Sequence, residues 1–210
     1  GNVIDPIQLI DTYGLDQTRY FLLREVPFGN DGDFSREAMI TRMNRDLAND
    51  YGNLVQRVLS MIQRNCDGKV PAPGAYTEDD DRLIIASTDM IVRVREEMSG
   101  QALSRALEVV FEVIAAANRY VDAQAPWALR KTDPDRMATV LYVLADVIRR
   151  LALVTQAFLP DASAKILDQL AVPEGARRLA DGEGTESSLS PGSALPPPQG
   201  VFPRHVEETA

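Results

Sequence analysis

The chain has 210 residues, of which 45% are hydrophobic and 25% are charged, and its net charge is −9. This composition is typical of a globular protein with its own core. The acidic total excludes a sequence-independent nucleic-acid coat, which needs a basic face, but it allows a localised site. Nineteen of the 22 basic residues are arginines, which favours planar, bidentate contacts. The single cysteine, Cys66, excludes an internal disulfide and a cysteine-built metal site, and it indicates a reducing, cytoplasmic setting.

Charged residues such as Glu112, Asp146 and Arg149 interrupt the most apolar stretches, so we expect no membrane-spanning helix. The chain opens with Gly1 rather than methionine and shows no secretory leader. We interpret it as a segment of a longer protein.

The first 34 residues form a mixed region. Residues 6–14 predict a short helix that ends at Gly14, and residues 16–26 predict a second one. Residues 27–34 are rich in turn formers and predict a loop.

Long helices are expected from Ser35 onward. Ser35 is a good N-cap for a helix to about residue 65, whose apolar stripe is Met39, Met43, Leu47, Tyr51, Leu54, Val58 and Met61. Residues 68–74 are a connector, Thr77 precedes a helix to about residue 99, and another helix covers about 102–124. Asp133-Pro134 starts a helix that includes Phe158 and stops at Pro160, and a short helix to about residue 170 follows.

These elements predict an all-α fold, an antiparallel bundle of four to five helices over residues 35–171. We expect a short mixed α/β segment over residues 1–34 and an extended Gly/Pro/Ser-rich tail over residues 172–210. Val201-Phe202-Pro203 is an apolar cluster in the tail, which either docks on another surface or frays.

No catalytic site is expected in this chain. The only histidine, His205, lies in the tail without a partner for a triad or a metal site, and the glycines form no phosphate-binding loop. The acidic run from Glu78 to Asp81 could suggest a divalent metal site, but we favour a solvated helix start.

Two features suggest a binding site. The segment Asn118-Arg119-Tyr120-Val121-Asp122-Ala123-Gln124-Ala125-Pro126-Trp127-Ala128-Leu129-Arg130-Lys131 contains the only tryptophan. Pro126 disfavours helix at Ala125 and places Trp127 at a corner, where the ring is either presented or plugs the core. Asn53 and Arg57 share a helix face and are either a pair that reads a base edge or ordinary surface residues.

The residues resemble those of the methionyl-tRNA synthetase family. Gly1-Asn2-Val3-Ile4-Asp5-Pro6, Tyr13-Gly14-Leu15-Asp16 and Arg19-Tyr20-Phe21-Leu22-Leu23 look like the segment after the KMSKS signature. Asp46, Asn49, Asn53 and Arg57 resemble the first helix of the anticodon domain, and Ala125-Pro126-Trp127 resembles its anticodon-reading corner. Pro196-Pro197-Pro198-Gln199-Gly200-Val201-Phe202-Pro203-Arg204 looks like a tail segment of bacterial single-chain members.

The resemblance implies a methionine–tRNA ligase that uses ATP and Mg, of which this chain is the tRNA-binding half. Trp127, directed by Pro126, would stack on the first base of the CAU anticodon, and Asn53 and Arg57 would hydrogen-bond anticodon bases. Tyr20, Asp46 and Asn49 match the stem-contact region, where Tyr20 and Asp46 are expected to hold the active site and bundle in register. The HIGH and KMSKS motifs, the methionine pocket and the zinc-binding insertion are absent, so we expect no catalysis by this chain alone.

Further expectations are a monomer in the cytoplasm that binds methionine tRNA and neither DNA nor a membrane. Two alternatives remain open at this point. One is a helical scaffold that binds a protein partner through its bundle face and Pro-rich tail. The other is the anticodon domain of a sister class I synthetase.

Overall fold

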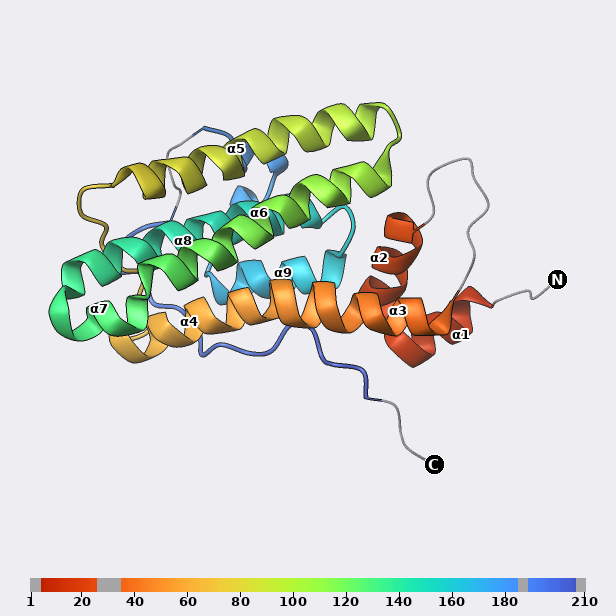
Figure 1. Cartoon of the computed structure of the whole chain (residues 1–210), viewed down its shortest axis with the longest axis horizontal. Coiled ribbons are helices and arrows are strands. Elements are labelled where there is room, and N and C mark those ends of the chain that lie inside the picture. The colour runs from red at the N-terminus through yellow and green to blue at the C-terminus, as the bar shows by residue number, and fades with distance from the viewer. Residues whose placement is uncertain (1–4, 26–34, 185–188, 207–210) are drawn as a thin grey trace.

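The computed structural model describes residues 5–25, 35–184 and 189–206, whose helices pack as an antiparallel bundle (Figure 1). In chain order the helices are α1 (Pro6–Tyr13), α2 (Leu15–Glu25), α3 (Arg36–Arg42), η1 (Met43–Gly52), α4 (Asn53–Asn65), α5 (Glu78–Ser99), α6 (Leu103–Gln124), α7 (Pro126–Thr132), α8 (Pro134–Thr155), α9 (Pro160–Gln169), η2 (Glu174–Ala176) and η3 (Leu179–Gly182). Apart from an isolated bridge between Lys69 and Ala194, these described ranges contain no β-structure. The all-α prediction is therefore confirmed, and the β part of the mixed segment is not found in residues 5–25.

The two N-terminal helices follow their local signals. The Asp5 side chain accepts a hydrogen bond of 2.9 Å from the Ile7 N–H at the start of α1. Gly14 ends α1 with a φ of +96°, a conformation that glycine adopts at little cost. The loop predicted over 27–34 lies outside the described residues.

The predicted helix from Ser35 is one continuous rod, α3–η1–α4, but its middle ten residues are π-helical. Ser35 caps it by accepting from the Ala38 N–H at 3.2 Å. Three successive steps of four residues, from Met39 to Tyr51, exceed the 3.6 residues of an α-helical turn. A wider turn keeps these side chains on the buried face, and the stripe itself did not distinguish the two helix types.

Helix α8 is the centre of the bundle and contacts α4, α5, α6, α7 and α9 (Figure 1). It is buried from Thr139 to Thr155 without interruption. The prediction that it extends to Phe158 is wrong. Arg19 of α2 donates to the carbonyls of Ala157 and Phe158, at 2.8 and 3.0 Å, and so satisfies acceptors just beyond the helix end.

The tail is extended only in part, because residues 172–184 contain the short helices η2 and η3. Its described residues 189–206 are extended and dock on the bundle rather than fraying. Val70 donates to Ser193 and accepts from Gly192, both within 2.9 Å. Phe202 is 8% exposed, and its ring centroid lies 5.5 Å from that of Tyr51 in η1. The tail therefore packs against the rod and runs below it in the view of Figure 1.

Candidate functional site

The corner after α6 presents its tryptophan to solvent. Ala125 has φ 44° and ψ 57°, the left-handed conformation, so α6 ends at Gln124 and α7 starts in a new direction. Pro126 is the buried first residue of α7, where its fixed φ suits a helix start. Trp127 follows with 51% of its surface exposed. The ring is therefore available for contact, and the alternative in which it plugs the core is wrong.

Arg57 comes from a different rod and meets this ring. Its guanidinium carbon lies 5.7 Å from the centroid of the Trp127 ring, within the range of a cation–π contact. Its Nη2 donates to Oδ1 of Asp122, on α6, at 2.8 Å. The arginine is thus held between an aromatic face and a carboxylate, with 40% of its side chain exposed. Sequence reasoning did not assign Asp122, although it lies inside the segment that drew attention.

Asn53 is the exposed first residue of α4 and precedes Arg57 by one turn on the same helix face. Its side-chain amide makes no hydrogen bond with another residue of the described ranges. The preceding π-helical segment is fastened to α6, because the Asn118 amide donates to the Asp50 carbonyl at 3.0 Å. The backbone just before Asn53 and Arg57 is therefore hydrogen-bonded to α6, the helix that contains Asp122.

The other three predicted residues lie in η1 and in α2, which packs against it. Tyr20 is fully buried and donates its hydroxyl to Asp46 at 2.8 Å, and Asp46 also accepts from Arg42 at 3.1 Å. Burial, and then the Asp46 carboxylate, raise the pKa of Tyr20, so it remains the donor. Asn49 is half-buried and accepts a hydrogen bond from Arg204 of the tail. These contacts join α2, η1 and the tail.

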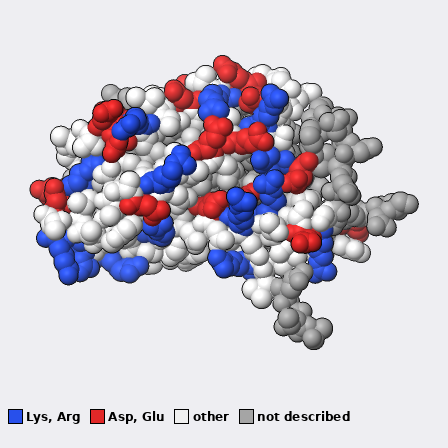
Figure 2. Space-filling model, in the orientation of Figure 1, with Lys and Arg blue, Asp and Glu red and all other residues white. Residues whose placement is uncertain are grey.

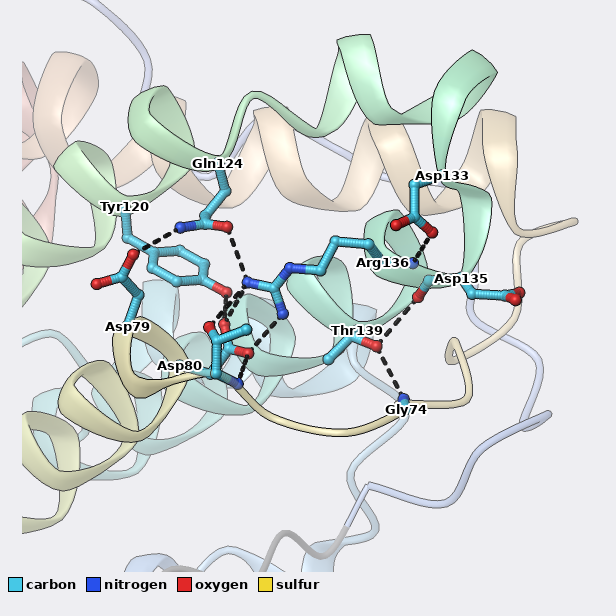
Figure 3. Close-up of polar contacts among 10 residues, drawn as sticks. Gly74, Asp79, Asp80, Tyr120, Gln124, Asp133, Asp135, Arg136 and Thr139 are labelled. Atoms are coloured by element: carbon cyan, nitrogen blue, oxygen red, sulfur yellow. Dashed lines mark hydrogen bonds and ion pairs between the residues drawn. The ribbon is translucent and has the colours of Figure 1, made fainter.

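A buried polar network beside the corner was not predicted (Figure 3). Asp80 is fully buried and accepts from Arg136 at 2.5 and 2.8 Å, from the Thr77 N–H at 2.8 Å and from the Tyr120 hydroxyl. Burial alone would raise the pKa of the Asp80 carboxyl, but the hydrogen bonds from Arg136, Thr77 and Tyr120 lower it to about 2.

The network corrects the prediction of a solvated acidic helix start, which fails for Asp80. The spacing of Thr77 and Asp80, N-cap and third helical residue, is that of a capping box and could have indicated a local role. No sequence signal pointed to Arg136, 56 residues later.

Among the described residues, no group of three or more His, Cys, Asp or Glu side chains could hold a metal ion. In the same ranges no helix is both long and apolar enough to cross a membrane.

Charges alternate over the visible face (Figure 2). Blue and red side chains are interspersed along the bundle, and several basic ones gather at the end where α7 lies. The last turn of α7 contributes Arg130 and Lys131 to that end. A polyanion would thus meet local positive charge there despite the acidic total.

Comparison with known proteins gives the same outline. Residues 70–210 match the family described as the anticodon binding domain of methionyl tRNA ligase, and residues 1–59 match tRNA synthetases class I (M). The methionine–tRNA ligase of Brucella suis is 56% identical over 99% of this chain, and that of Mycobacterium leprae is 46% identical over 98%. The chain spans about 40% of the length of these relatives.

Solved structures agree with the fold. The apo methionyl-tRNA synthetase of Mycobacterium tuberculosis superposes with a TM-score of 0.94 at 45% identity, over 98% of this chain and 42% of that one. The structure of the same enzyme bound by methionyl-adenylate gives 0.92 at 46% identity, over 97% of this chain and 40% of that one.

The helical bundle and its matches define the class of protein, an anticodon-binding domain of a class I tRNA synthetase. Within that class, the chain belongs to the methionyl-tRNA ligase family. This membership rules against the two alternatives that the sequence left open. The bundle matches an anticodon-binding domain rather than a protein-binding scaffold, and the matching family is that of methionine rather than of a sister synthetase.

Proposed function

We propose that this chain reads the CAU anticodon of methionine tRNA on behalf of an enzyme that joins methionine to the tRNA with ATP. The observation that carries the proposal is the half-exposed Trp127 ring with the Arg57 guanidinium against it. RNA sequence is readable where bases are unstacked, and an exposed indole offers such a base a stacking surface.

The roles of the residues are those that the family resemblance implies, and their chemistry fits these roles. Trp127 stacks on the first anticodon base, in the direction that Pro126 sets. Arg57 has five N–H donors, of which the described residues engage one, at Asp122. Asn53 adds a planar amide, both donor and acceptor, one turn away. Together these groups supply stacking and edge contacts without a large basic surface.

The predicted stem-contact residues join elements of the fold and do not contact anticodon bases in this proposal. Tyr20 and Asp46 join α2 to the rod through a buried hydrogen bond, and Asn49 joins the rod to the tail. We infer that these contacts keep the bundle in register with a catalytic half. The family resemblance implies that ATP and Mg would act in that half and that any zinc would lie upstream of this chain. The monomeric state, the cytoplasmic location and the lack of DNA or membrane binding stay predictions.

The experiment is a fluorescence titration of the chain, in which Trp127 is the only tryptophan. A hairpin RNA with a CAU loop should quench the emission, and a hairpin with the first base changed should bind more weakly. Stacking contributes about 1–3 kcal/mol per base, so Trp127→Ala should weaken binding about 5- to 150-fold, measured by the anisotropy of a dye-labelled hairpin because this variant has no tryptophan. In the enzyme with its catalytic half, the same change should slow tRNA charging and spare methionine activation.

A matched control is available for the arginine. Arg57 and Arg93 are each about half exposed, and each donates to one carboxylate at 2.8 Å, Asp122 and Glu112 respectively. Arg57→Ala should weaken binding of the CAU hairpin, and Arg93→Ala, on α5, should not. Equal losses for the two variants, or unchanged binding by Trp127→Ala, would contradict the proposed function.

A further inference from the structure

One side chain connects the three helices around the tryptophan corner (Figure 3). Arg136 lies in the first turn of α8, and its guanidinium makes a two-pronged contact with Asp80 at the start of α5. Nη2 of Arg136, one of the two nitrogens that contact Asp80, also donates to Oε1 of Gln124, the last residue of α6, at 2.8 Å. The planar fork of arginine allows these contacts at once, which a lysine cannot reproduce.

The backbone of Arg136 holds the other side of the corner. Its N–H donates to the Asp133 side chain at 3.0 Å, and the Asp133 N–H donates to the Leu129 carbonyl at the end of α7. Gln124 precedes and Asp133 follows the segment 125–132, which includes all of α7. Both ends of this segment are therefore tied to Arg136, one through its side chain and one through its main chain.

The segment needs such ties because its first residue is strained. Ala125 is in the left-handed conformation, which residues with a Cβ seldom adopt and which persists only where neighbouring contacts enforce it. Trp127 is two residues further on. A small rotation at Ala125 would therefore swing the ring away from Arg57, which comes from a separate rod.

We propose that Arg136 and Gln124 are positioning residues for anticodon binding, which fix the direction in which Trp127 is presented. This inference rests on the proposed function, and it assigns the network a role beyond stabilising the bundle. Asp80, buried and ionised, holds the guanidinium in place, so the Gln124 contact is the part that can be removed at small structural cost.

The test compares Gln124→Ala with Gln156→Ala. Gln156 is also half-buried, and it donates to carbonyls of Leu153 and Arg177 at the far end of α8. Each variant loses two hydrogen bonds, because the Gln124 amide also donates to Asp79 at 3.1 Å. Loss of the contact with Arg136, which positions the ring, should weaken binding of the CAU hairpin about three- to tenfold. In the protein without RNA, Gln124→Ala should also lower the fluorescence anisotropy of Trp127 and increase its quenching by acrylamide. Gln156→Ala should change neither measurement.

A second variant, Arg136→Lys, keeps a positive charge beside Asp80 and should shift both measurements in the same direction as Gln124→Ala. The positioning role is overturned if Trp127→Ala weakens binding while Gln124→Ala and Arg136→Lys bind and fluoresce like wild type. It is also overturned if Gln124→Ala weakens binding with unchanged fluorescence of the free protein, since the amide would then touch the RNA itself. If Trp127→Ala binds normally, the proposed function fails and this inference fails with it.

Discussion

Replacing Asp80 by Asn should destabilise the bundle in a strongly pH-dependent manner. The substitution keeps the shape of the side chain and removes its negative charge. Arg136 is then left without the carboxylate that it contacts at 2.5 and 2.8 Å inside the bundle. Breaking a buried ion pair at one partner leaves an uncompensated charge, which is costly.

The magnitude follows from the titration of the carboxyl. In the folded protein the pKa of Asp80 is about 2, compared with its ordinary value of 3.8. At about 1.4 kcal/mol per unit of pKa, the ionised carboxylate contributes about 2 kcal/mol to the free energy of unfolding. Because the folded-state pKa is the lower one, this contribution is complete above about pH 5. It is lost as the pH falls from there toward 2.

The assay is urea unfolding of wild type and Asp80→Asn, followed by circular dichroism at pH 7, 5 and 3. The difference in unfolding free energy should be about 2 kcal/mol at pH 7 and should shrink clearly at pH 3. Asp81→Asn is the matched control, because Asp81 is the exposed next residue of the same helix turn. A difference that stays constant from pH 7 to pH 3, or one equal to that of Asp81→Asn, would refute the reasoning.

Two further substitutions test the contacts that η1 makes with α2 and with the tail. Tyr20→Phe removes the hydroxyl bonded to Asp46 and should cost about 1–2 kcal/mol in urea unfolding, whereas Tyr76→Phe, at an exposed tyrosine, should cost nothing measurable. Phe202→Ala removes the ring packed on Tyr51 and should cost about 3 kcal/mol. It should also speed tryptic cleavage in the tail, and an unchanged cleavage rate would show that this ring does not anchor the tail.

Much of the fold could be predicted because its signals are local. Ser35 and Asp133 cap their helices through their own side chains, and Gly14 and Pro126 mark an end and a start. The π-helical stretch escaped prediction, since the stripe from Met39 to Tyr51 satisfies either helix type until packing decides. The end of α8 also escaped, because the arginine beyond it comes from α2.

The residues of the proposed site could be nominated from the sequence, but the contacts between them could not. Trp127, Asn53 and Arg57 came from short motifs and from family resemblance. That Arg57 lies against the ring and is held by Asp122 depends on how α4 packs beside α6. The Asp80–Arg136 pair joins residues far apart in the chain, and a run of four acids hid the buried member among solvated neighbours.

Two sets of contacts lie on one rod, the first within η1 and the second just beyond it. Asp46 engages α2 near its beginning, and Arg57 reaches the ring just beyond its end. Each residue of an α-helix turns the chain by about 100°, since 3.6 residues complete a turn. Winding η1 as an ordinary α-helix, or deleting one residue from it, would rotate everything downstream about the rod axis. The π-helical backbone of η1 therefore sets the rotation, about the rod axis, between the side chains that contact α2 and the side chain that contacts the tryptophan.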